Sequence, residues 1–364
     1  MGIRFDRTTR RATNGPMIFF TDPSAEIDLC EEIRGAISSR LSFYAYRRPG
    51  DIMISFGSSE SAIEGLSEPG FVIAPFNPND PVITIPYRAG GKGVSSKETQ
   101  PPFPARSTTP EEHADEIAVI QDTLRQNGGG KIVAARAIVN DGELDVAETF
   151  TNLCHRYPKA FVFAFSTPQT GCWIGASPEL LMEGHGDKLR TMALAGTRPA
   201  GTPGDWDDKN VEEQAMVTDY ICDCLKRHDI VPEPEPSRTV GAGTVEHICT
   251  PIMASTGQSF TSASLTALLR DLSPTPALCG LPKELAQQTI NDTEKFQRGC
   301  YGGFCGPYKS PSEFYFSVIL RCAQATAERY CLYVGGGITL KSNPTSEWEE
   351  TELKAQTLLM NIAP

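Results

Sequence analysis

Acidic and basic side chains that could perform chemistry are concentrated near the end of the chain, in the stretch GGGITLKSNPTSEWEETELK at 335–354. On an α-helix, Glu347, Glu350 and Lys354 would lie within roughly 60° of one another, on one face. Two carboxylates and an ammonium beside a glycine-rich loop could hold a divalent cation together with an anionic ligand. A solvated helix face with ordinary (i, i+4) ion pairs is the alternative interpretation of the same residues.

A further carboxylate, Glu213, occupies the middle of an apolar stripe on a helix predicted over 208–226. Its neighbour Glu212 falls about 100° away on such a helix, toward solvent. A buried carboxylate is costly unless it is paired or bound to a metal. Glu213 is therefore expected either to form a satisfied ion pair or to act as a Mg²⁺ ligand that complements Glu350.

Three other segments contain candidate catalytic or binding residues. Lys131 opens the strand-like segment KIVAARAIV directly after three glycines. Lysines at strand ends are usually exposed, but burial would disfavour the charged form and leave a neutral amine that can act as a general base. Glu179 follows Pro178 in GASPELLM, and the fixed proline backbone favours one direction for its carboxylate. His247, in TVEHICT, and Arg321, expected at a strand end and sheet edge, are unremarkable alone.

The elements that must position these side chains are both strands and helices. Ser346 and Glu349 form a potential capping box, which predicts that the last helix begins there, after the glycine loop. Strands are predicted in the segments MIFF, FYAYR, IMISFG and FVIAPF and at 131–139, 160–166, 171–176, 189–194, 314–321 and 329–334. Helices are predicted at 25–39, 112–126, 144–154, 208–227, 261–271, 282–291 and 346–361. Residues 88–111 are predicted to form a loop or an ordered excursion.

Length and composition restrict the class of protein. The 364 residues are 40% hydrophobic and 21% charged, which is typical of a globular chain, and no internal repeat or disordered linker divides them. One large α+β domain over 1–364 is therefore expected. The net charge of −12 argues against a nucleic-acid partner, and an anionic substrate would need a local metal or cationic group.

Two further observations bear on the environment of the protein. No apolar run approaches the roughly 20 residues of a membrane-spanning helix, so no membrane association is expected. The eleven cysteines are scattered without a CxxC pair. Free thiols in a reducing cytoplasm are expected.

A series of motifs in fixed order resembles the chorismate-binding enzymes, which include isochorismate synthases, salicylate synthases, anthranilate synthase component I and aminodeoxychorismate synthase. The resemblance is strong over 125–362 and weak over the first 120 residues. It implies one large chorismate-binding domain with antiparallel sheets and helices packed on the outside. The motifs are SPELL (177–181), LAGTRPAG (194–201), EHICT (246–250), SPTPALCGLP (273–282), FQRGCYGGFCG (296–306), VILRCA (318–323), VGGGI (334–338) and SEWEETELK (346–354).

The resemblance also implies a role for each candidate residue. Glu213 and Glu350 match the two Mg²⁺-binding glutamates, and Glu347 matches a residue beside them on the same face. Lys131 matches the lysine that activates water for attack at C2 of chorismate, and Glu179 matches the general acid that protonates the departing 4-hydroxyl. The residues expected to hold the substrate are Thr197, His247, Ala277, Tyr301, Arg321, Gly335, Gly336, Gly337 and Lys354.

The chain departs from the family pattern next to the first metal glutamate. Gln214 stands where a histidine is common, and Lys209 and Asn210 stand where a second acidic residue is common. These departures affect the surroundings of the metal site, while the two central glutamates are retained.

Two residue types distinguish the activities within the family. Aminodeoxychorismate synthases carry a nucleophilic lysine where Ala277 stands here, and anthranilate synthases, which use ammonia, lack the lysine at Lys131. We therefore expect an isochorismate synthase that depends on Mg²⁺ and needs no redox cofactor and no glutaminase subunit, with a product for menaquinone or siderophore biosynthesis. A salicylate synthase, anthranilate synthase component I and a catalytically inactive chorismate-binding relative remain the alternatives.

Overall fold

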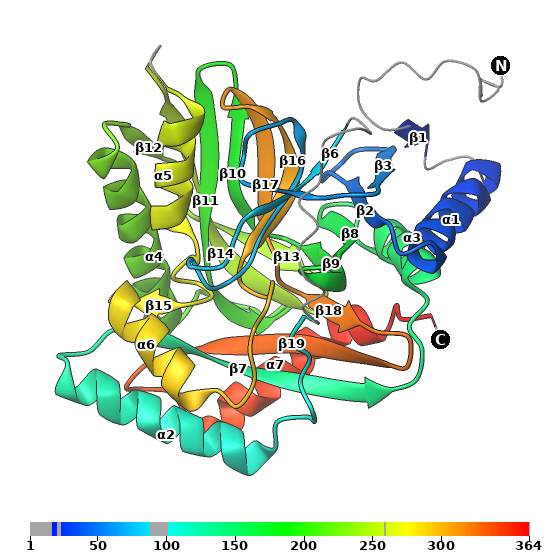
Figure 1. Ribbon diagram of the computed structural model, residues 1–364. Helices are drawn as coiled ribbons and strands as arrows, with labels where there is room; N and C mark the ends of the chain where they lie inside the picture. The colour runs from blue at the N-terminus through cyan, green and yellow to red at the C-terminus, as the bar shows by residue number, and fades with distance from the viewer. Residues whose placement is uncertain (1–16, 20–22, 88–100, 258–259, 364) are drawn as a thin grey trace.

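The computed structural model describes residues 17–19, 23–87, 101–257 and 260–363 of the chain. Two large antiparallel sheets pack against each other, and helices lie on the outside (Figure 1). This architecture confirms the predicted α+β class. Among the described residues, none of the helices has both the length and the apolar composition needed to cross a bilayer. Much of the loop predicted at 88–111 lies outside the described residues.

The first sheet has nine strands in the spatial order β1-β3-β2-β8-β9-β18-β19-β7-β15. Each of its strand pairs is antiparallel. Its strands are β1 (Met17–Phe19), β2 (Ser42–Arg47), β3 (Met53–Ser59), β7 (Lys131–Asp141), β8 (Phe161–Thr167), β9 (Gly171–Ser177), β15 (Gly280–Leu281), β18 (Cys322–Ala325) and β19 (Arg329–Ile338).

The second sheet has ten strands, nine of them in the order β12-β14-β11-β10-β17-β16-β5-β6-β4, with β13 also paired to β14. These pairs are antiparallel as well. Its strands are β4 (Ile63–Glu64), β5 (Gly70–Ala74), β6 (Ile83–Pro86), β10 (Leu180–His185), β11 (Lys188–Pro199), β12 (Pro232–Pro234), β13 (Arg238–Ala242), β14 (Val245–Ser255), β16 (Phe304–Ser310) and β17 (Glu313–Val318).

Aromatic side chains fill the space between the two sheets. Phe165 of β8 faces Phe71 of β5 with 6.1 Å between ring centroids, and Phe161 of β8 stacks on Tyr315 of β17 at 5.3 Å. These contacts belong to one large buried apolar cluster that draws side chains from both sheets. Because such rings bury large areas, the cluster fixes the two sheets face to face.

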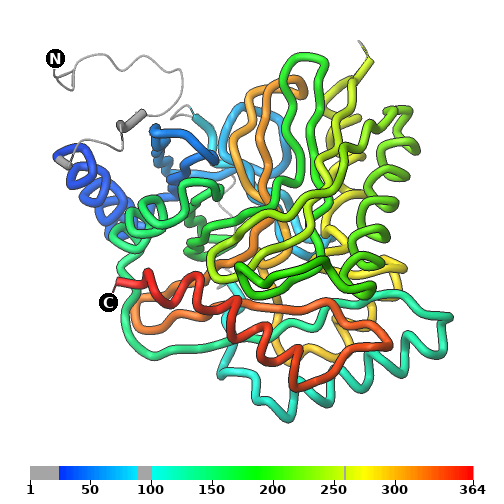
Figure 2. Tube along the Cα trace, turned by 180° about the vertical axis from the view of Figure 1, so that it is seen from behind, coloured from blue at the N-terminus to red at the C-terminus, as the bar shows by residue number. Residues whose placement is uncertain are grey.

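Seven helices are described, and they lie at the periphery of the sheets (Figures 1 and 2). The N-terminal helix packs beside α3, while α4 lies against β11 and α7 lies against β19. The helices are α1 (Pro23–Ser38), α2 (Pro110–Gln126), α3 (Val146–Arg156), α4 (Asp208–Arg227), α5 (Ser262–Leu272), α6 (Lys283–Thr293) and α7 (Pro344–Leu359).

The start of α7 differs from the prediction. The side chain of Asn343 caps the helix by accepting hydrogen bonds from the backbone N–H groups of Thr345 and Ser346, at 3.0 and 3.2 Å. Pro344 occupies the first helical position, where its lack of an N–H costs nothing. The predicted capping box between Ser346 and Glu349 is therefore wrong, because Asn343, three residues before Ser346, caps the helix instead.

Two further expectations about strand ends are also wrong. The three glycines at 335–337 do not form a loop but continue β19, where they pair with Ala135, Ala134 and Val133 of β7. Arg321 does not end a strand at the sheet edge, since β17 stops at Val318. It lies in the β17–β18 connection with a φ of 50° and is buried.

Strand β14, which contributes to the site, was missed because Pro251 interrupts its β-like pattern. In the structure, β13 pairs with β14 as far as Cys249, and β12 pairs from Ile252 onward. Pro251 falls between these two partners, so its missing N–H breaks no ladder on that side.

Candidate active site

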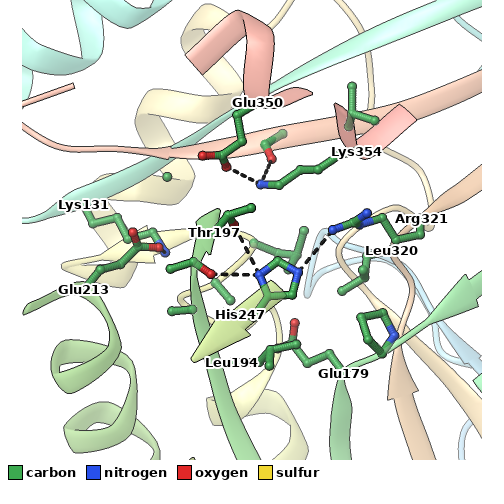
Figure 3. A pocket seen from close by; sticks show the side chains of 18 of the residues that line it. Lys131, Glu179, Leu194, Thr197, Glu213, His247, Leu320, Arg321, Glu350 and Lys354 are labelled. Atoms are coloured by element: carbon green, nitrogen blue, oxygen red, sulfur yellow. Dashed lines mark hydrogen bonds and ion pairs between the residues drawn. The ribbon is translucent and has the colours of Figure 1, made fainter. Parts of the chain in front are cut away.

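Nearly all of the predicted site residues line one cavity of about 80 Å³ (Figure 3). The lining comes from both sheets and from α4 and α7. Gly336 does not line the cavity itself, but it lies directly beneath the α7 carboxylates. The predicted residues in the lining are Lys131, Glu179, Thr197, Glu213, His247, Ala277, Tyr301, Arg321, Gly335, Gly337, Glu347, Glu350 and Lys354.

Lys131 and Glu213 form a buried pair at one end of this cavity. The lysine side chain is only 2% exposed, so it is not the exposed strand-end lysine considered above, and its Nζ donates to Glu213 Oε1 at 2.6 Å. Burial acts to raise the pKa of Glu213, but the Lys131 ammonium and the nearby Lys354 and Lys209 outweigh it and lower that pKa. Glu213 is therefore an ionised carboxylate.

Glycine at position 337 makes room for this pair. A Cβ on Gly337 would lie 2.3 Å from Lys131 Cε and 3.1 Å from Glu213 Oε1. Both distances are shorter than ordinary van der Waals contact, so any larger residue would push the lysine aside. The glycine run therefore places the Lys131 side chain across β19.

Glu179 is held rigidly at the base of the cavity. Its backbone carbonyl accepts from Ser317 Oγ at 2.8 Å, and its backbone N–H donates to Ser177 Oγ at 3.2 Å. Burial raises the pKa of its side chain to about 8, against the opposing effects of the Thr275 hydroxyl, which donates at 3.2 Å, and of the Lys131 charge. Near neutral pH the side chain is mostly a protonated acid, as a proton donor requires.

His247 and Arg321 form a hydrogen-bonded chain at the other end of the cavity (Figure 3). His247 Nδ1 lies 2.8 Å from the carbonyl oxygen of Gly196, which can only accept, so Nδ1 carries the proton. Nε2 then accepts from Arg321 Nη2 at 3.2 Å. Burial and the charges of Arg321 and Lys354 lower the pKa of His247 to about 3, so the imidazole is neutral.

Arg321 is a buried cation that lacks an acidic partner in the parts of the chain that the structure describes. Its two donors reach neutral groups, the His247 ring and Thr357 Oγ1, the latter at 2.8 Å. Burial lowers the pKa of Arg321 to about 10, which leaves the guanidinium charged at neutral pH. A buried charge without a counterion is unfavourable, so this geometry favours a ligand that brings a carboxylate.

The two carboxylates of α7 that line the cavity, Glu347 and Glu350, are both paired with lysines. Glu350 Oε1 lies 2.6 Å from Lys354 Nζ, which also donates to the carbonyl of Gly335 at 2.8 Å. The buried Glu347 lies 3.0 Å from Lys209 Nζ. Together with the Lys131–Glu213 pair, these contacts give each of the three candidate metal carboxylates an ammonium partner.

The same carboxylates have the chemistry of a divalent-cation site. A Cβ on Gly336 would lie 3.0 Å from Glu347 Oε2 and 3.7 Å from Glu350 Oε1, and a Cβ on Gly337 would lie 3.1 Å from Glu213 Oε1. The glycines therefore leave space beside all three carboxylates. Hard oxygen ligands suit Mg²⁺. Among the described residues no three acidic, histidine or cysteine side chains converge as a preformed metal centre. The donor set fits the ion if the ion replaces the lysine contacts.

Several lining residues were not predicted as site residues from the sequence. Lys209 and Asn210 were noticed only as departures from the family pattern, yet both line the cavity, and Asn210 Oδ1 accepts from the backbone N–H of Thr197 at 3.1 Å. Thr275, which donates to Glu179 but does not itself line the cavity, could have been suspected from its place in SPTPAL. Leu194 and Leu320 supply apolar lining that no sequence signal distinguishes from core.

Comparisons with known proteins agree with this site. A family profile described as "Chorismate binding enzyme" matches residues 91–363, and the chain belongs to this family. It is 29% identical over 313 residues to the vibriobactin-specific isochorismate synthase of Vibrio cholerae, which covers 79% of this chain and 78% of that protein. It is 32% identical over 260 residues to isochorismate synthase MenF of Escherichia coli K12, which covers 66% of this chain and 58% of that protein.

A solved structure shows the same fold. The menaquinone-specific isochorismate synthase MenF from Escherichia coli aligns with a TM-score of 0.74 at 23% identity, over 88% of each chain. The alignment thus extends beyond the strongly matching region of 125–362 into the N-terminal part that the sequence motifs leave weakly matched.

Proposed function

We propose that this protein is an isochorismate synthase that converts chorismate to isochorismate. The observation that carries the proposal is that a buried lysine, Lys131, and a buried protonated acid, Glu179, line the same cavity as Arg321, a cation suited to a carboxylate ligand. The two relatives described above are both named isochorismate synthases, which supports the same reaction.

In this reaction Lys131 removes a proton from water as the water oxygen attacks C2 of the ring. The ring double bonds shift, and the bond from C4 to its hydroxyl breaks. Glu179 supplies the proton that lets this hydroxyl leave as water, so one water enters and one departs. The ammonium that Glu213 holds in the structure must give up a proton before Lys131 can act as the base. In the reverse direction the two residues exchange roles.

The remaining residues bind and orient the substrate. Arg321, oriented by the neutral His247, would hold the enolpyruvyl carboxylate with two parallel hydrogen bonds. Tyr301 and the backbone of Gly335 lie beside the same space. A Mg²⁺ ion would be held by Glu213 and Glu350, with Glu347 beside them, and would bind and neutralise the ring carboxylate.

Ala277 supports water over another nucleophile. It lines the cavity where a lysine would place an amine near the ring, and its methyl group can take no part in attack. We accordingly propose that the enzyme needs no glutaminase subunit. We also propose a cytoplasmic location, with which the eleven free thiols, nine of them buried, are compatible.

Product analysis tests the proposal. Purified protein with chorismate and Mg²⁺ should yield isochorismate, identified by chromatography and NMR, and isochorismate should yield chorismate in return. If the wild-type protein forms salicylate and pyruvate, the roles of Lys131 and Glu179 remain, but the protein is a salicylate synthase. Binding of chorismate without any turnover would indicate the inactive relative considered above.

A further inference from the structure

A second cavity, of about 360 Å³, adjoins the candidate active site. Pro178 and Arg321 line both cavities, so these two residues form the partition between them. The rest of its wall comes from the end of α3, the tip of the β13–β14 hairpin and the C-terminal part of α7. Figure 2 shows these three segments on one side of the molecule.

The described residues that line the second cavity include three cations and no carboxylate. The cations are Arg156, Lys159 and Arg321. Three other cavities, near Asn77, Phe296 and Tyr87, each include two or more carboxylates. The chain as a whole has a net charge of −12, so the positive charge of this cavity is opposite in sign to that of the protein.

The two outer cations are available to a ligand. Arg156 and Lys159 are both exposed, and neither forms an ion pair or a side-chain hydrogen bond among the described residues. Arg156 lies in the last turn of α3, where a cation also complements the helix dipole. The helix dipole does not explain Lys159, which follows the helix. It also does not explain why Arg156 and Lys159 line the same cavity as Arg321.

We propose that this second cavity is an antechamber through which a dicarboxylate substrate reaches the active site. This inference rests on the proposed function for the identity of the substrate. Arg156 and Lys159 attract the carboxylates from solution, and Arg321, which faces both cavities, receives one of them at the partition. Converging cations in a concave site raise the association rate of an anion, and salt weakens this effect. Here they also offset the repulsion of the acidic protein.

The charge of the antechamber can be tested by stopped-flow mixing of the full-length protein with chorismate and Mg²⁺, followed by tryptophan fluorescence. The double variant Arg156→Gln/Lys159→Gln should associate with chorismate about tenfold more slowly at low ionic strength, within the range known for steering. The difference should shrink as salt is added. The control Lys188→Gln/Lys226→Gln removes two exposed cations elsewhere, with the same change in net charge, and should keep the wild-type rate.

A steric variant tests the route independently of charge. A Cβ on Gly241, in β13 close to the hairpin turn, meets no atom within 4 Å, so Gly241→Trp can fill the antechamber without a clash at its own backbone. It should slow association at every salt concentration. Gly35→Trp, at an exposed site on α1 that is equally open, is the matched control.

The outcomes separate this inference from the proposed reaction. Wild-type association rates in both Arg156→Gln/Lys159→Gln and Gly241→Trp would overturn the antechamber, as would an equal loss in the control variants. Product formation is measured separately by chromatography. Wild-type protein that binds chorismate with the expected salt dependence but forms no isochorismate would overturn the reaction and leave the antechamber standing.

Discussion

At one end of the cavity Glu213, Glu347 and Glu350 each contact a lysine, whereas at the other end Arg321 is buried with only neutral groups as partners among the described residues. The first end is electrically balanced and can accept a divalent cation only by exchanging its lysine contacts. The second end carries an uncompensated positive charge. The difference supports our proposal of a metal at one end and a substrate carboxylate at the other, and the following experiments probe each end.

The largest effect is expected at the balanced end. Glu350→Gln removes a carboxylate from the proposed metal site, and loss of the ion should cost several kcal/mol in the transition state, or roughly 10³-fold in turnover and more. Glu349→Gln, at the exposed neighbouring position of α7, should retain activity. Turnover and Mg²⁺ titration by calorimetry measure both. Full activity after treatment with EDTA would show that the reaction does not require a metal ion.

Glu179 lies between the two ends and should have the next largest effect. Glu179→Gln keeps the shape but cannot donate a proton, so turnover should fall by about 10²–10⁴-fold while chorismate still binds in the presence of Mg²⁺. Glu183→Gln, in the following strand β10 but outside the cavity lining, is the control. Near wild-type turnover by Glu179→Gln would assign the acid to another group.

The pH dependence gives a second measurement on Glu179. Since burial raises its pKa to about 8, the acid form that donates a proton predominates below pH 8 and is lost above it. The ratio of the forward rates of wild type and Glu179→Gln at saturating chorismate cancels any effect of pH on Lys131, and it should decline above that pH by roughly tenfold for each further unit. A ratio that stays level from pH 7 to pH 10 would show that proton donation by this group does not limit turnover.

Arg321→Lys tests the unbalanced end. A lysine keeps the charge but cannot form two parallel hydrogen bonds to a carboxylate, and loss of one such charged bond is worth about 1.5–3 kcal/mol. The expected result is a fall of roughly ten- to hundredfold in kcat/KM, with the fold intact by circular dichroism. An unchanged kcat/KM would move the carboxylate site away from Arg321, with Lys354 as the next candidate.

The smallest effect is expected for Lys209, one of the three residues that depart from the family pattern. Its ammonium competes with a cation for Glu347, so Lys209→Gln should tighten Mg²⁺ binding by a few-fold, in line with about 0.5–1 kcal/mol for a partly exposed ion pair. Lys341→Gln serves as the control. It breaks an exposed ion pair between Lys341, in the loop before α7, and Glu212 of α4. Weaker Mg²⁺ binding in Lys209→Gln would mean that Lys209 supports the site.

The sequence predicted the helices of the site well and its strands and connections less well. Glu213 is identifiable because a carboxylate on an apolar helical stripe breaks a strong pattern, and α4 has the predicted bounds. The pairing of Glu213 with Lys131 joins α4, which packs on the second sheet, to β7 of the first sheet, and no local pattern encodes this packing. Likewise, the position of Arg321 follows from a φ of 50° in a connection.

The glycine run shows why a local reading failed at the centre of the site. Three successive glycines favour a loop when only the chain is considered. In the fold they are strand residues whose missing side chains make room for Lys131 and for the α7 carboxylates. Their role is set by groups that lie far away in the sequence, so only the assembled structure reveals it.

Incubation of the wild-type enzyme with chorismate and Mg²⁺ in H₂¹⁸O, followed by mass spectrometry of the product, tests the central claim most directly. If Lys131 activates water for attack at C2, isochorismate formed under initial-rate conditions carries one ¹⁸O atom, in its C2 hydroxyl. Unlabelled isochorismate would show that the hydroxyl is transferred from C4 without exchange and would contradict the assignment of Lys131 and Glu179 as base and acid.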